Sequence, residues 1–144
     1  MTSLEELLRR DGVLVYKTRG RSMLPMLRED RDLVTVVPPK EPPKKGDVIL
    51  FRLESGVYVL HRVIGTKEGL FITRGDNNYT ADTAPVKEVL GVLTGFKRRG
   101  KEYSVRHPGY RLYAFLWTAL FPMRRAAFRI RRRLRRILKR LPKK

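Results

Sequence analysis

The sequence Val57-Tyr58-Val59-Leu60-His61-Arg62-Val63-Ile64 decides how this chain folds. It is rich in β-branched and aromatic residues, which favour an extended strand. Ser55-Gly56 immediately before it is typical of a hairpin turn, and the preceding run Val48-Ile49-Leu50-Phe51-Arg52 has the same strand character. These features predict an antiparallel hairpin with a histidine in its second strand.

Short apolar runs separated by glycine and proline turns continue this pattern on both sides of the hairpin. Further strands are expected at Val13–Tyr16, Asp32–Val37, Leu70–Thr73 and Val89–Phe96. A short helix is expected from Ser3 to Asp11, because Ser3 can cap it, acids occupy its first turn, and Gly12 can end it. The predicted fold is therefore mainly β, with an antiparallel, partly closed sheet and a short N-terminal helix.

The amino-acid composition excludes several kinds of site, and the distribution of charge divides the chain into two parts. The 144 residues include no cysteine, which excludes disulfides, thiolate metal sites and a cysteine nucleophile. The net charge is +19, but from Lys97 onward eighteen Lys and Arg face a single acid, Glu102. The first two thirds of the chain are nearly neutral, so any affinity for a polyanion belongs to the C-terminal part.

We therefore expect two segments, a β domain at residues 1–106 and a tail at residues 107–144. His107-Pro108-Gly109 reads as a hinge, with His107 as a loop residue that has no role. Leu112–Met123 is uncharged and rich in aromatic residues. From Ala127 to Leu141, apolar residues recur at intervals of three and four among arginines and lysines, which predicts a basic amphipathic helix that Pro142 stops.

Four residues could form a catalytic site. Ser22 lies in Gly20-Arg21-Ser22-Met23-Leu24-Pro25, His61 lies in the predicted strand, and Asp76 and Asp82 follow downstream. A serine hydroxyl needs a neighbouring base to attack a carbonyl, histidine can accept that proton near neutral pH, and a carboxylate can orient the imidazole. Each residue also has a purely structural interpretation, as a turn serine, a packed histidine and turn-forming acids.

Taken in order and spacing, these segments resemble the motifs of signal peptidases. The resemblance runs from Gly20 to Phe96 and includes Lys45-Gly46-Asp47-Val48, His61-Arg62-Val63 and Gly75-Asp76-Asn77-Asn78, with Asp82 six residues after Asp76. It implies a signal-peptidase-like serine endopeptidase that removes a leader or signal segment from a peptide or pre-protein, with small side chains favoured before the cleaved bond.

The resemblance also assigns roles. Many relatives use a lysine base, whereas this chain has His61, like the archaeal and eukaryotic secretory-membrane branch. Ser22 is then the nucleophile, His61 the general base, Asp82 the third member and Asp76 a second acid of the same site. No cofactor or metal is expected. Relatives often carry a serine hydroxyl for the oxyanion two residues before the nucleophile, where this chain has Gly20, so the second oxyanion donor stays open.

The tail predicts association with an anionic membrane surface, peripherally or through one short C-terminal segment, with the cytoplasmic face preferred. Twelve uncharged residues from Leu112 to Met123 would span about 18 Å as a helix, against a hydrocarbon core of ~30 Å. A helix lying in the interface, with its basic face toward anionic lipid, suits the pattern better. Docking of Leu112–Met123 on the β domain is the alternative, and binding of nucleic acid is less favoured.

Two other functions are consistent with parts of the sequence. The first is a catalytically silent binding module whose tail recruits lipid, leader peptide or nucleic acid, which Gly20 supports. The second is a LexA-type self-cleaving regulator. The histidine base, the absence of an Ala-Gly dipeptide and the short stretch of 21 residues before Ser22 all argue against that regulator.

Overall fold

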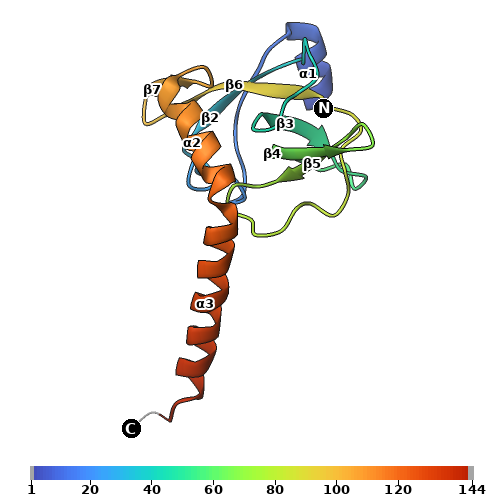
Figure 1. The fold of residues 1–144 in the computed structure, drawn as a ribbon. Helices are drawn as coiled ribbons and strands as arrows, with labels where there is room; N and C mark the ends of the chain where they lie inside the picture. The colour runs from blue at the N-terminus through green and yellow to red at the C-terminus, as the bar shows by residue number, and fades with distance from the viewer. Residues whose placement is uncertain (1, 143–144) are drawn as a thin grey trace.

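The computed structural model describes residues 2–142, so residues 1 and 143–144, at the outer ends of the two predicted segments, lie outside the description. Within the described residues one antiparallel sheet is combined with a short helix before it and two helices after it (Figure 1). The helices are α1 (Leu4–Asp11), α2 (Pro108–Ala119) and α3 (Phe121–Arg140). The strands are β1 (Leu14–Lys17), β2 (Leu33–Val37), β3 (Val48–Arg52), β4 (Tyr58–Lys67), β5 (Leu70–Arg74), β6 (Gly91–Arg98) and β7 (Lys101–Ser104).

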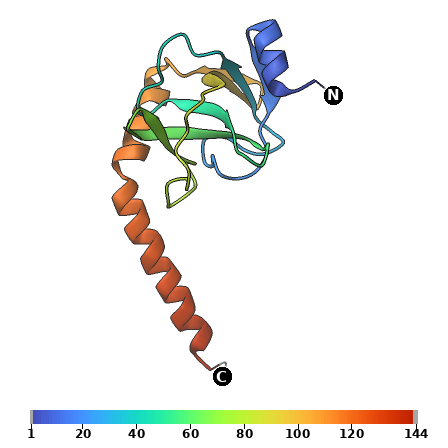
Figure 2. The same ribbon diagram turned by 90° about the vertical axis from the view of Figure 1, so that its right-hand side faces the viewer.

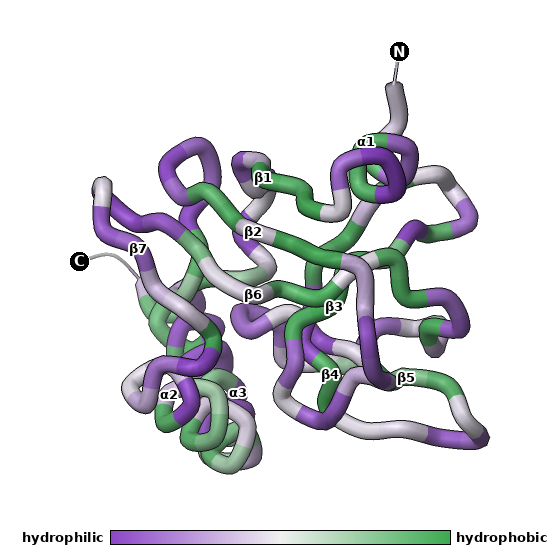
Figure 3. Tube along the Cα trace, turned by 90° about the horizontal axis from the view of Figure 1, so that it is seen from above, coloured by the Kyte–Doolittle hydropathy of each residue, from purple (hydrophilic) through white to green (hydrophobic). Residues whose placement is uncertain are grey.

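The sheet is open. Its strand order is β1-β2-β6-β3-β4-β5, with β7 paired to β6 (Figure 3). Every strand pairing in it is antiparallel, which confirms the predicted mainly β, antiparallel class. The sheet does not close, because β1 and β5 stand at opposite ends of this order.

The sequence predicted most of these elements. Helix α1 has the expected cap, since the Ser3 hydroxyl accepts from the Glu6 N–H and the Glu6 carboxylate accepts from the Ser3 N–H. Strand β7 was not predicted, because its residues are mostly polar and exposed and give no apolar pattern.

The predicted hinge at His107-Pro108-Gly109 is instead the start of α2. His107 is the N-cap residue, its Nδ1 accepts from the Gly109 N–H at 3.0 Å, and Pro108 occupies the first turn. Proline is favoured there because the first helical N–H has no intrahelical partner to lose. His107 therefore has a structural role that the interpretation as a loop residue missed.

Alternation along the central hairpin separates two apolar clusters. In β3, Val48 and Leu50 belong to the larger cluster, whereas Ile49 and Phe51 belong to the smaller one. Successive side chains of a strand point to opposite faces. Since His61 pairs with Ile49 and Arg62 pairs with Val48, these two neighbours in β4 face opposite sides of the sheet.

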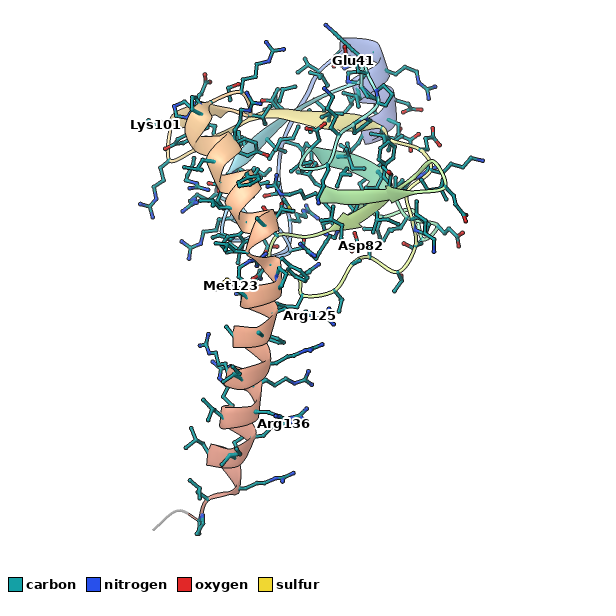
Figure 4. The ribbon with its side chains drawn as sticks, viewed as in Figure 1. Glu41, Asp82, Lys101, Met123, Arg125 and Arg136 are labelled. Atoms are coloured by element: carbon teal, nitrogen blue, oxygen red, sulfur yellow. The ribbon has the colours of Figure 1, made fainter. Side chains whose placement is uncertain are left out.

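The tail has one part against the domain and one part beyond it. Helix α2 packs Tyr110 and Tyr113 against the larger cluster, whereas α3 has no buried residue and extends away from the sheet (Figures 1 and 2). Figure 4 shows Arg136 on this extended part, well beyond Met123 at the start of α3. Among residues 2–142, no helix combines the length and the apolar character needed to cross a membrane.

Candidate active site

Ser22 lies in an irregular loop between β1 and β2 that the core and a neighbouring turn hold in place. The side chains of Met23, Met26 and Leu27 are buried in the larger apolar cluster, while Ser22 stays partly exposed. The Ser22 carbonyl accepts from the Asn77 N–H at 2.8 Å. The loop is thus anchored at the serine backbone and just after it, while the serine stays partly exposed.

Gly75 explains how closely that turn approaches. A Cβ on Gly75 would lie 2.6 Å from the Ser22 carbonyl oxygen, a distance that real side chains do not tolerate, and 3.0 Å from the Ser22 Cβ. The Asn78 N–H closes the turn by donating to the Gly75 carbonyl at 2.9 Å. A glycine is therefore required at the point where the turn meets the serine loop.

His61 and Asp82 form a hydrogen-bonded pair. The distance from His61 Nδ1 to Asp82 Oδ2 is 2.6 Å, and the Thr73 hydroxyl donates to the same carboxylate oxygen at 2.7 Å. The Asp82 N–H donates to the Thr73 carbonyl, which fixes the acid beside the end of β5 (Figure 4). A carboxylate on Nδ1 fixes the imidazole so that its other nitrogen, Nε2, carries the free lone pair.

These contacts also set the charge of the acid. Burial alone would raise the pKa of Asp82, but the hydrogen bonds from His61 and Thr73 outweigh it and lower the pKa below its ordinary value. Asp82 therefore remains a carboxylate at neutral pH and can stabilise a positive charge on the imidazole.

Ser22 and His61 line the same cavity, whose volume is about 610 Å³. Its walls come from the end of β1 and the residues that follow it, from the serine loop, and from the start of β4. Among residues 2–142, the Ser22 hydroxyl makes no hydrogen bond to His61. In catalytic sites without substrate such bonds are often long, and they tighten when substrate binds.

Asp76 lies in a different network from His61. Arg62 donates to both of its carboxylate oxygens, from Nε at 2.7 Å and from Nη2 at 2.8 Å, and the Tyr113 hydroxyl donates to Oδ2 at 3.0 Å. Arg62 and Asp76 are only 1% and 3% exposed. The structure thus groups His61 with Asp82 on one face of β4 and Arg62 with Asp76 on the other.

Two threonines near the site were not singled out from the sequence. Thr73 pairs with Val63 across β4 and β5, two residues from His61, so strand alternation could have placed it on the histidine face once the register was known. Thr18 lines the cavity shared by Ser22 and His61, and within residues 2–142 its buried hydroxyl has no hydrogen-bond partner. No sequence pattern marks it.

Arg74 links strand β5 to the tail. It faces the same side as its partner Arg62, and its guanidinium lies 3.3 Å from the centre of the Phe121 ring in α3. Burial and the charges of Arg124 and Arg125 lower the pKa of Arg74. The side chain therefore joins β5 to the tail, on the face opposite His61.

Comparison with known proteins agrees with the family resemblance over part of the chain. Signal peptidase I W of Bacillus subtilis (strain 168) is 47% identical over 60 residues, which are 38% of this chain and 32% of that protein. This similarity supports a relationship to the signal peptidase family. The chain spans about a third of the length of this relative. No family model matches the chain.

The lowered pKa of Asp82 predicts an acid-dependent loss of stability. A carboxyl whose pKa is lower in the folded protein than its unfolded value of ~3.9 stabilises the fold above that pH, and this contribution disappears as pH falls through the folded pKa. We expect Asp82→Asn to reduce the fall in unfolding free energy below about pH 4. Urea titrations of both proteins from about pH 2 to pH 6 measure this, and equal acid slopes would contradict the assignment.

Proposed function

We propose that this protein is a serine endopeptidase of the signal peptidase type that uses a histidine base and removes a leader or signal segment from a peptide or pre-protein. The observation that carries the proposal is the His61–Asp82 hydrogen bond of 2.6 Å beside the cavity that Ser22 also lines. The partial similarity to Signal peptidase I W supports the same class of activity.

In this mechanism Ser22 Oγ attacks the scissile carbonyl while His61 Nε2 takes the hydroxyl proton. The imidazolium that forms is stabilised by the Asp82 carboxylate on Nδ1, and it then gives the proton to the leaving amine. Water attacks the acyl-enzyme by the same route, with His61 first accepting its proton and then returning it to Ser22 Oγ. In this proposal Asp76 does not exchange protons with substrate and serves to position the turn beside Ser22.

The substrate that fits this site is an extended peptide. Strand β5 pairs with β4 only from Arg62 onward, so the segment Tyr58–His61 has β3 on one side alone. Strand β1 is the last strand at its end of the sheet, and its end lines the other wall of the cavity. An extended peptide can hydrogen-bond to strand edges of this kind and bring its backbone past Ser22.

The oxyanion of the tetrahedral intermediate requires hydrogen-bond donors. The backbone N–H of Ser22 is the first donor in this proposal. Gly20 has no side chain to provide the second, and the Thr18 hydroxyl is the candidate because Thr18 lines the cavity and its buried hydroxyl has no other partner among the described residues. Thr18 would thus take the role that a serine two residues before the nucleophile has in many relatives.

The proposal includes association with an anionic membrane surface through α3. Ten of the twenty residues of α3 are Lys or Arg and none is acidic. Its exposed apolar side chains recur at helical spacing, which gives one apolar face opposite the basic residues. On this face lie Met123, Ile130, Leu134, Ile137 and Leu138, and Leu141 follows just after the helix ends. This chemistry suits a helix that lies in the headgroup region of anionic lipid.

Cleavage of a leader peptide tests the catalytic assignment. We expect Ser22→Ala and His61→Ala each to reduce kcat by roughly 10⁴-fold or more, and Asp82→Asn to reduce it by about the same order, because the three groups act as a unit. The measurement is the release of both product peptides, followed by mass spectrometry, with Glu54→Gln as an exposed control. Equal cleavage by the wild type and the Ser22 and His61 variants would refute the proposal and favour the silent binding module.

Thr18→Val separates an oxyanion donor from a structural threonine. Valine has nearly the same shape, and removing an unpaired buried hydroxyl should not reduce the unfolding free energy. Loss of an oxyanion donor should reduce kcat by about 10²–10³-fold with little change in KM. Unchanged kcat in a stably folded variant would exclude this role for Thr18.

Vesicle co-sedimentation tests the membrane assignment. We expect the full chain to bind vesicles containing anionic phospholipid, to bind neutral vesicles far more weakly, and to lose affinity as salt rises. Leu134→Gln combined with Ile137→Gln should weaken binding by at least about tenfold without changing cleavage of a soluble peptide. Tighter binding of duplex DNA than of anionic vesicles at the same salt concentration would favour a nucleic-acid partner instead.

A further inference from the structure

The tail contacts one short turn of the β domain through several side chains. The Tyr113 hydroxyl donates to Asp76 Oδ2 at 3.0 Å, and the Trp117 indole N–H donates to the Asp76 carbonyl at 2.8 Å. Arg124 Nη1 donates to the same carbonyl at 3.3 Å. Two helices far along the chain therefore hold both the side chain and the backbone of Asp76.

These contacts form a continuous stripe along the tail helices. Its members recur every three or four residues, which places them on one helical face. They are Tyr110, Tyr113, Trp117, Phe121, Arg124 and Phe128, and each contacts a residue of the β domain. Arg124 also lies over the Trp117 ring at 3.9 Å and donates to the Trp117 carbonyl, so the contacts to Asp76 support one another.

The turn that the tail contacts also supports the serine loop, the segment between β1 and β2 that contains Ser22. The neighbours of Asp76 in the chain make the contacts to Ser22: the Asn77 N–H donates to its carbonyl at 2.8 Å, and Gly75 lies against it with no room for a Cβ. Asp76 itself meets the loop, since its N–H lies 3.5 Å from the Met23 sulfur. A shift of Asp76 would therefore move the backbone on which Ser22 rests.

The donors from the tail are suited to a permanent contact. Burial and the neighbouring charge of Asp76 raise the pKa of Tyr113, so its phenol stays protonated and can donate. The indole N–H of Trp117 does not titrate at all. The contact between tail and turn is thus independent of pH across the range in which a histidine base works.

We propose that Tyr113 and Trp117 are positioning residues for Ser22, which act by fixing the Gly75–Asn77 turn against the serine loop. This inference rests on the proposed function, because it concerns how well Ser22 is placed for attack. A misplacement of the nucleophile by about 1 Å can cost about 10²-fold in rate. In this proposal the tail has two roles: it helps to position Ser22 in the β domain, and it contacts the membrane.

The experiment uses Tyr113→Phe and Trp117→Phe, singly and together, in the full chain. Each variant removes one donor and keeps an aromatic ring. We expect the double variant to lower kcat for leader cleavage, and the rate at which a fluorophosphonate acylates Ser22, by about 10–100-fold. KM and the shape of the pH profile should not change, because neither residue lines the cavity or contacts His61 or Asp82.

Tyr103→Phe is the matched control. Tyr103 stacks on Phe96 in the same apolar cluster, but its hydroxyl has no part in the contacts to Asp76. Arg124→Lys is a second test that keeps the charge and the fold: it removes the planar donor to the Asp76 carbonyl, and we expect a smaller fall of about 2–5-fold. Urea unfolding verifies that every variant retains a cooperative transition.

The outcomes separate this inference from the proposed function. Wild-type protein that reacts no faster than Ser22→Ala would refute the peptidase proposal itself. Wild-type activity together with unchanged kcat and labelling in the Tyr113 and Trp117 variants would refute the positioning role alone. A rise in KM at constant kcat would also overturn it, because the tail would then act in substrate binding.

Discussion

The buried ion pair between Arg62 and Asp76 is the interaction on which the rest of the structure depends. Both side chains are almost completely removed from water, and a charge left alone there would cost roughly 3–5 kcal/mol. Arg62 also donates to the Gly46 carbonyl and to the Tyr110 hydroxyl. Strand β4, the turn after β5, the segment before β3 and helix α2 must therefore all meet at one point.

This constraint gives β4 two roles on its two faces. Arg62 organises the packing of the domain against α2, whereas its neighbour His61 faces the opposite side with Asp82 and Thr73. The separation follows from strand geometry alone. It keeps the Arg62 charge on the opposite face from the His61–Asp82 pair, and it explains why two aspartates close in sequence belong to different networks.

The sequence predicted the elements far better than it predicted the contacts between them. The hairpin around His61, the helix capped by Ser3 and the mainly β class followed from local patterns. The partner of Asp76 did not, because a resemblance that names two acids cannot say which face each one occupies without the strand register. The role of Trp117 was also hidden, since an aromatic run with few charges looks the same whether it meets lipid or a carbonyl oxygen. Strand β7 lacked any apolar periodicity to reveal it.

The composition of α3 has a consequence for the helix itself. Its many arginines fall at spacings of three and four, where like charges repel, and no acid within the helix offsets them. Beyond Phe128 every residue of α3 is exposed, so tertiary packing does not compensate along that part of the helix. The stability of this helix therefore depends on the anions around it, which reduce the repulsion between its basic side chains. Its helical content is set by the ionic surroundings as much as by the sequence.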